Sequence, residues 1–361
     1  MALLRATPYQ TMAGITIVPL LLKNGGVHKN MCSLNSIIQI LNNIPEFRSQ
    51  LQELGEGSEL LKELQSILST AGANVSTSAL NLRRLMAQET GIPLDSGAQH
   101  DTVELFNYLL DHIPSGLFRF QTQTEYSFST EECPSGCPLC GRYPPPVTAT
   151  QKFLKLALPT PATSPLQLED LIERHFSSQL QSEGRHCRYC HSNTQPTSKI
   201  PYTEKCKVVL YPEYLLVQIL RMNFSEGKTV KNSWPILIAK TENIQVDAQS
   251  YDIIGAISHI GTANAGHNRA YVYSAPFWFC CEDARSPFQK VPSDDTVEQN
   301  YCIILKKSKS KNPLCHSTIP LLDDYERDPQ QGLKRPLSEE SIQNNSDYPK
   351  NVCLGCRKEF A

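Results

Sequence analysis

The stretch NMCSLNSIIQIL, residues 30–41, places a cysteine directly before apolar residues spaced by three and four positions. That spacing is typical of an amphipathic helix and puts Cys32 in its first turn. Unpaired backbone amides and the helix dipole favour a thiolate there, and the thiolate is the nucleophilic form of cysteine. The alternative is a buried, inert thiol, which is the commoner outcome for a single cysteine at a helix start.

A second stretch, GHNRAYVYS at residues 266–274, supplies a histidine in a glycine turn that leads into an alternating strand. A papain-type site needs such a distant histidine, and an acid or amide to orient its second ring nitrogen. Glu282 and Asp283 follow an aromatic strand at 277–279, and a hairpin of the two strands would bring one carboxylate to His267. His259 is the rival base, although a lone imidazole is more simply structural.

The pattern outside these stretches changes along the chain from helical to sheet-rich. Residues 32–118 are helical, and Asp101 with Glu104 has the form of a capping box that starts a helix over Thr102–His112. The later part contains one further helical segment, Leu166–Leu180. Strands are expected at 118–128, 152–158, 207–210, 214–220, 251–260 and 301–305. We therefore expect an α+β fold.

Composition bounds the class of protein. The 361 residues carry 34 basic and 36 acidic groups, so no overall positive field favours nucleic acid or a membrane surface. The 13 cysteines and the lack of a leader pattern favour a reducing, cytoplasmic or nuclear setting. The apolar run at 15–22 is broken by Pro19 and is too short for a membrane helix. Residues 1–20 are read as a lead-in, and 307–361 as a disordered tail with few large apolar residues.

Two CxxC pairs, Cys137 with Cys140 and Cys187 with Cys190, are separated by positions 141 to 186. Each such turn places two sulfurs on one side of a tight loop, so four thiolates can close a tetrahedral zinc site. The intervening segment is long, and sheet pairing would have to bring the two pairs together. The alternative is four ordinary reduced cysteines. A site of four thiolates leaves no open position for water, so the zinc would be structural.

The ordered motifs resemble the catalytic core of the ubiquitin-specific proteases, which are thiol isopeptidases. The match runs through NMCSLNS, AQHDTVELF, the two CxxC pairs, PEYLLVQILRM, YDIIGAISHIG, GHNRAYVYS, WFCCEDA and YCIIL. The resemblance implies a papain-like core over 21–306, with a helical thumb (21–117), zinc-bearing fingers with inserted palm elements (118–210) and a β-sheet palm (211–306). Within the family, QHD followed by a non-histidine and WFC before the acid look most like the member that removes the interferon-induced, two-domain ubiquitin-like modifier.

Carried over by position, the resemblance implies that Cys32 is the nucleophile and His267 the general base. It implies that Glu282 takes the third triad position and that Asp283 is the acidic residue beside it. The cysteines of the two CxxC pairs match the zinc ligands. Departures from the family pattern are Val27 for an oxyanion-donating asparagine, Lys29 for a glycine, Glu282 for Asp or Asn, and Asn268 for a tyrosine. Asn24 or Asn30 is a candidate substitute donor, and Asp283 a candidate to orient His267.

The resemblance implies removal of ubiquitin or a ubiquitin-like modifier from lysines, by a monomer with structural zinc. The departures predict reduced turnover, because losing one oxyanion donor typically costs on the order of a hundredfold to a thousandfold. Two alternatives stay open: a modifier-binding scaffold of the same fold without catalysis, and a zinc-ribbon nucleic-acid binder.

Overall fold

The computed structural model describes most of the chain between residues 9 and 309. The described residues are 9–10, 16–17, 20, 22–24, 29–54, 57–69, 76–94, 99–113, 116–128, 137, 140–142, 144–159, 166–187, 189–190, 199–225, 227–274, 277–283, 288–290 and 299–309. Val27, most of the expected lead-in and the expected tail beyond residue 309 lie outside them.

Five of the six described helices precede the two large sheets in the chain. The helices are α1 (Cys32–Asn42), α2 (Pro45–Glu53), α3 (Glu59–Ser69), α4 (Ser76–Thr90), α5 (Thr102–His112) and α6 (Leu168–Phe176), with a 3₁₀ turn, η2 (Gly116–Phe118). The predicted start of α5 is confirmed. The Asp101 carboxylate accepts hydrogen bonds from the backbone amides of Val103 and Glu104, at 2.8 and 3.0 Å. It thereby satisfies two of the donors that a helix start leaves free.

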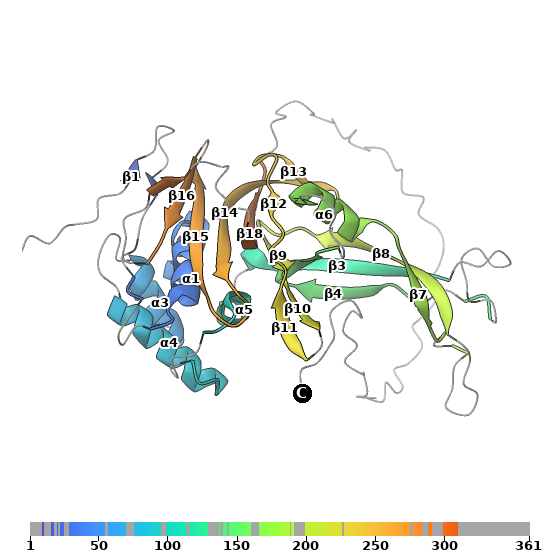
Figure 1. Ribbon diagram of the computed structural model, residues 1–361, viewed down its shortest axis with the longest axis horizontal. Coiled ribbons are helices and arrows are strands. Elements are labelled where there is room, and N and C mark those ends of the chain that lie inside the picture. The colour runs from blue at the N-terminus through green and yellow to red at the C-terminus, as the bar shows by residue number, and fades with distance from the viewer. Residues whose placement is uncertain are drawn as a thin grey trace, which may run out of the picture. The chain divides into compact units, whose positions relative to one another are not determined.

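Two large sheets hold most of the strands (Figure 1). The larger, the palm sheet, runs β17-β16-β15-β14-β18-β9-β5, with β13 paired to β14; the smaller, the fingers sheet, runs β4-β3-β8-β7. The palm strands are β5 (Phe153–Ala157), β9 (Tyr214–Leu220), β13 (Ile244–Val246), β14 (Gln249–Gly261), β15 (Gly266–Ser274), β16 (Phe277–Cys281), β17 (Phe288–Lys290) and β18 (Asn300–Lys307). The fingers strands are β3 (Phe120–Ser127), β4 (Val147–Gln151), β7 (Gln179–Arg185) and β8 (Ile200–Leu210). Three small pairs complete the set: β1 (Tyr9–Gln10) with β2 (Thr16–Ile17), β6 (Leu166–Gln167) with β12 (Ile236–Leu237), and β10 (Met222–Ser225) with β11 (Lys228–Lys231).

Both faces of the palm sheet are buried. Successive residues of a strand point to opposite faces, so neighbouring residues enter two different cores. Ile257, Ala270 and Ile304 face the core shared with the thumb helices α1 to α5. Their neighbours Tyr271 and Ile303 face a second core, which α6 covers. The palm sheet is thus a layer between the thumb helices on one face and α6 on the other.

Helix α1 lies in the middle of the thumb and packs against β15 and β14. Every residue of α1 is buried, including the polar side chains of Asn35 and Gln39. Gly255 of β14 permits this close approach, because a Cβ there would lie 2.9 Å from the Ile40 side chain and 2.9 Å from the Tyr271 carbonyl. The helix that carries Cys32 therefore packs closely against the sheet that carries His267.

The expected helix over Leu166–Leu180 is wrong at both ends. Residues 166–167 form β6, α6 ends at Phe176, and β7 begins at Gln179. Leu180 pairs with Thr203 of β8, so tertiary strand pairing overrides the helical spacing of the leucine. Its side chain is 71% exposed, which shows that it does not extend the apolar face of α6.

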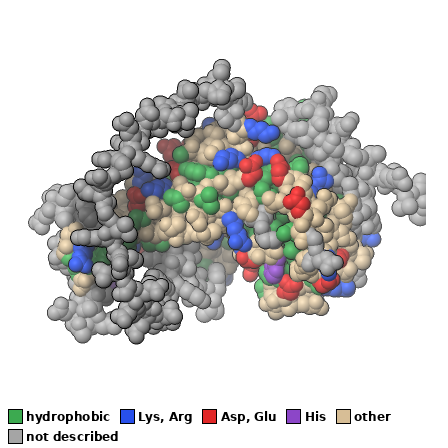
Figure 2. All heavy atoms as spheres, turned by 180° about the vertical axis from the view of Figure 1, so that it is seen from behind, with side chains coloured by type: hydrophobic (Ala, Val, Ile, Leu, Met, Phe, Trp, Pro, Cys, Tyr) green, Lys and Arg blue, Asp and Glu red, His purple; other side chains and the backbone are tan. Residues whose placement is uncertain are grey.

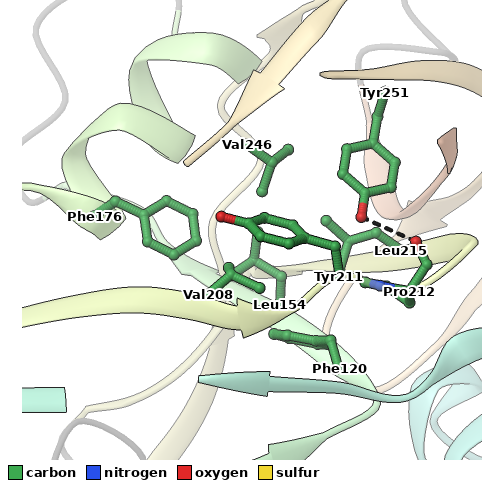
Figure 3. A pocket seen from close by; sticks show the side chains of 9 residues that line it. All are labelled: Phe120, Leu154, Phe176, Val208, Tyr211, Pro212, Leu215, Val246 and Tyr251. Carbon is green, nitrogen blue, oxygen red and sulfur yellow. Dashed lines mark hydrogen bonds between the residues drawn. The ribbon is translucent and has the colours of Figure 1, made fainter. Parts of the chain in front are cut away.

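An apolar seam joins the base of the fingers to the palm, and Figure 3 shows its side chains converging around Tyr211. The Tyr211 hydroxyl donates to the Asp247 carboxylate at 3.0 Å, and the same carboxylate accepts the amide of Val208 at 2.8 Å. Tyr251 donates from its hydroxyl to the Pro212 carbonyl at 3.0 Å. These bonds fix the end of β8 to the turn that precedes β14.

The surface and helices of the described part add two findings. On the face in Figure 2, acidic and basic side chains lie among one another rather than separated by sign. None of the described helices combines the length and the apolar character that crossing a membrane would require.

Candidate active site and zinc-binding cluster

Cys32 is the first residue of α1 and is 3% exposed. The preceding residue, Met31, offers no side-chain cap, so the first amides of the helix are not neutralised by a side-chain oxygen of the cap residue. Burial raises the pKa of the Cys32 thiol, but hydrogen bonds from His267 and Asn268 outweigh it. The net pKa lies below the ordinary value, as a nucleophilic thiolate requires.

His267 lies near the start of β15, and its hydrogen bond to Cys32 is the main reason that its pKa is raised. Burial opposes this shift, while the negative charges of Cys32 and Asp283 add to it. The ring Nε2 lies 2.9 Å from Glu282 Oε1. A lowered thiol pKa beside a raised imidazole pKa favours the thiolate–imidazolium pair.

The predicted hairpin is present, because β15 pairs antiparallel with β16 and Ala270 lies opposite Cys281. Glu282, not Asp283, makes the direct contact with His267: the Asp283 carboxylate lies 3.8 Å from Nε2. The longer glutamate also accepts a hydrogen bond from Nε of Arg269 at 3.1 Å. Its side chain is therefore held from two sides.

Asp283 is fixed to the thumb. Asn35 of α1 donates to its Oδ1 at 2.8 Å, and Asn24 donates to its Oδ2 at 3.2 Å. Asn24 also accepts the backbone amide of Met31 at 3.1 Å. The Asn24 side chain, a candidate oxyanion donor, thus ties the start of α1 to Asp283.

His259 is on β14, opposite Asn268 of β15. Burial, together with the positive charge of Lys231, lowers the pKa of His259 to about 4. The imidazole is thus neutral at pH 7, and its ring lies 6.5 Å from that of Tyr301. This environment favours a structural histidine.

Sequence reasoning missed two side chains that the structure brings to the site. Gln99 both donates to the Gly266 carbonyl at 2.6 Å and accepts the Gly266 amide at 2.8 Å, which anchors the turn before His267. Asn268 donates to Ser33 Oγ at 3.0 Å and to Cys32 Sγ at 3.9 Å. Both residues lie inside the quoted motifs, but nothing in their spacing indicated these contacts.

The two CxxC turns come together at the end of the fingers, as predicted, so that all four ligand atoms lie within 4.8 Å of one another. The sulfurs of Cys137 and Cys190 are 3.7 Å apart, and those of Cys140 and Cys187 are 3.9 Å apart. A tetrahedron with zinc–sulfur bonds of about 2.3 Å has sulfurs about 3.8 Å apart, so the cluster fits zinc. The amide of Gly141 donates to the Cys137 carbonyl at 2.7 Å in a turn where Gly141 has φ +65°.

The papain-like fold and the Cys32–His267 pair define a class, the thiol hydrolases. The sequence profile described as ubiquitin carboxyl-terminal hydrolase matches residues 22–305. The chain belongs to that family, and family and fold together place it among the cysteine-type deubiquitinating hydrolases.

Solved structures support the fold. A chain of the SAGA DUB module of Ubp8, Sgf11, Sus1 and Sgf73 bound to monoubiquitin matches with TM-score 0.62 and 17% identity, covering 81% of this chain and 69% of that chain. The same module bound to ubiquitin aldehyde gives TM-score 0.61 and 17% identity, covering 81% and 70%. The yeast module with a mutant Sgf73 gives TM-score 0.61 and 16% identity, covering 81% and 68%. No curated protein sequence matches the chain significantly.

Proposed function

We propose that this protein is an active thiol isopeptidase that removes ubiquitin or a ubiquitin-like modifier from target lysines. The observation that carries the proposal is the contact chain from Cys32 through His267 to Glu282, in which the pKa of the thiol is lowered and that of the imidazole is raised. Its three members come from three separate segments of the sequence, and an inert buried thiol would not need them.

In this mechanism the Cys32 sulfur attacks the carbonyl carbon of the modifier's C-terminal glycine. The isopeptide bond to the target lysine breaks, and His267 gives its proton to the departing amine. Water, activated by His267, then cleaves the thioester and regenerates the thiol. Glu282 holds the imidazole in position and stabilises its positive charge, as the third member of such a triad does.

The fingers and the zinc-binding cluster would act in binding rather than in chemistry. Cys137, Cys140, Cys187 and Cys190 would hold a structural zinc that ties the β3–β4 side of the fingers to the β7–β8 side. Bound by four thiolates, the zinc has no open position and stabilises the fold. Two of the solved structures with this fold contain ubiquitin or ubiquitin aldehyde, which supports a modifier of the ubiquitin type as partner.

The finer choice of modifier is part of the proposal. The QHD and WFC motifs support the interferon-induced, two-domain modifier as a substrate beside ubiquitin. The sharpest test is a panel of modifiers, ubiquitin and the two-domain protein among them, each carrying a C-terminal propargyl electrophile. We expect one covalent adduct, at Cys32, and different rates between modifiers. Cys206→Ala is the matched control, because Cys206 is a partly exposed thiol of the fingers strand β8.

The second candidate is a non-catalytic scaffold that binds modifiers, and it is favoured by valine at position 27, where the family has its oxyanion donor. It predicts binding of folded modifier without adduct formation. Cleavage of modifier C-terminal amides by the wild type, lost in Cys32→Ala and kept in Cys206→Ala, supports the isopeptidase. Equal background rates for wild type and Cys32→Ala would reject the isopeptidase and favour the scaffold.

A further inference from the structure

Asn268 occupies an unusual place for an asparagine side chain. It belongs to the face of β15 that carries Ala270 and Val272 into the thumb core, and it is 8% exposed. Its amide nitrogen lies 3.0 Å from Ser33 Oγ and 3.9 Å from Cys32 Sγ. The amide therefore lies under the first turn of α1, in contact with the sulfur.

The orientation of this amide follows from its neighbours. The Ser33 hydroxyl donates its only proton to the His100 carbonyl at 2.8 Å, so Ser33 Oγ can only accept from Asn268. The NH₂ group must then face Ser33, and its second N–H is free to point at the sulfur. In the opposite orientation the amide oxygen would meet the lone pairs of Ser33 and the negative sulfur.

The amide oxygen of Asn268 has no hydrogen-bond partner among the described residues, although it is buried. A buried acceptor without a partner destabilises a fold. An apolar side chain of the same size would avoid that cost, so structure alone does not account for an asparagine here. The donors of the amide do account for it, because hydrogen bonds to a charged acceptor are the strong ones.

We propose that Asn268 donates a hydrogen bond to the Cys32 thiolate and thereby stabilises the nucleophilic form of this cysteine. The Asn268 amide is held in place by its hydrogen bond to Ser33 Oγ, and the Ser33 hydroxyl in turn donates to the His100 carbonyl. The inference rests on the proposed function, in which Cys32 reacts as a thiolate. Side-chain and backbone hydrogen bonds from Asn268 are among the groups that lower the pKa of Cys32, after that from His267.

The substitutions of Asn268 and Ser33 leave the other ionisable residues of this region unchanged in sequence. They are His267 on β15, Glu282 and Asp283 after β16, and His100 ahead of α5, whose pKa burial lowers. A shift that follows substitution of Asn268 or Ser33 can therefore be assigned to the loss of the donor.

The test is the pH dependence of Cys32 alkylation by iodoacetamide, measured by mass spectrometry on the peptide that contains Cys32. Asn268→Leu keeps the approximate size of the side chain and removes both N–H donors of its amide, while the backbone donor stays. Ser33→Ala keeps the amide and removes its anchor. Ser36→Ala is the matched control, because the Ser36 hydroxyl bonds to the Cys32 carbonyl at 2.8 Å rather than to its sulfur.

We expect the wild-type inflection below the ordinary thiol value. In Asn268→Leu the inflection moves to higher pH. A smaller fraction of Cys32 is then thiolate at a given pH below the inflection, so alkylation there slows about three- to tenfold, while the rate on the alkaline plateau is kept. Ser33→Ala moves the inflection less, and Ser36→Ala leaves it unchanged. If Asn268→Leu fails to fold by circular dichroism, Ser33→Ala decides. The Asn268 inference alone is overturned if the wild-type inflection lies below the ordinary thiol value and both Asn268→Leu and Ser33→Ala show that same inflection. An ordinary wild-type inflection overturns it together with the proposed function.

Discussion

An ion pair holds thumb and palm together, and its loss should be measurable as a change in stability. Glu46, in the first turn of α2, receives a charged hydrogen bond from Lys306 of β18 at 2.5 Å. The hydroxyl of Tyr214, on β9, donates to its other oxygen. Although burial acts in the opposite direction, these contacts lower the pKa of Glu46 from 4.5 to about 2.

The size of the effect follows from that shift. A difference of about 2.5 units, at about 1.36 kcal/mol each, corresponds to about 3.4 kcal/mol. The Glu46 side chain is 44% exposed, so solvent and salt screen the pair, and we expect about 1 to 1.5 kcal/mol. Glu46→Gln should therefore lower the free energy of unfolding by about that amount at pH 7, and by less at high salt.

The pH dependence has a definite sign. A carboxyl whose pKa is depressed on folding stabilises the fold above its unfolded pKa, and this contribution disappears as pH falls through the folded value. The difference between wild type and Glu46→Gln should thus be constant above pH 4.5 or so and shrink toward pH 2. Urea unfolding followed by circular dichroism measures both free energies.

The control is Glu59→Gln. Glu59 pairs with Lys62 at 3.0 Å on the surface of α3, and its side chain is 74% exposed. Exposed pairs of this kind contribute little, so Glu59→Gln should unfold like the wild type. Equal stability of Glu46→Gln and wild type at pH 7, or a difference that grows on acidification, would refute the reasoning.

Three further predictions concern the site, the fingers and the core. Glu282→Gln should lower kcat/KM for a modifier amide about ten- to a hundredfold, since it removes the charge next to His267 while Asp283 stays nearby; an unchanged value in steady-state kinetics would contradict the assigned role. Cys190→Ala should abolish stoichiometric zinc in metal analysis and lower the melting temperature; zinc retained at one equivalent would exclude the four-thiolate site. Arg221→Met should destabilise the fold by about 2 to 4 kcal/mol, because the fully buried guanidinium donates to three backbone carbonyls. A midpoint of urea unfolding equal to that of the wild type would disprove this prediction.

Sequence patterns predicted the local structure well where the interactions behind the pattern lie within one turn of the chain. The capping pair at Asp101 and Glu104 placed α5 correctly, because a cap acts on the amides of its own turn. The same kind of argument failed for Leu180, whose helical spacing was outweighed by pairing with a strand more than twenty residues away. Propensity is a weak guide wherever a sheet offers a competing set of hydrogen bonds.

By itself, the sequence determined the reactive groups: a cysteine at a helix start, a distant histidine, two neighbouring acids and two CxxC turns. Their chemistry is a property of the side chains. Only the tertiary structure decided that Glu282 rather than Asp283 touches His267, that the four thiols share one site, and that Asn268 and Gln99 belong to the active site. These contacts join residues far apart in the chain across distances of a few ångströms, and such distances are set by how α1 packs on the palm sheet, which no local pattern encodes.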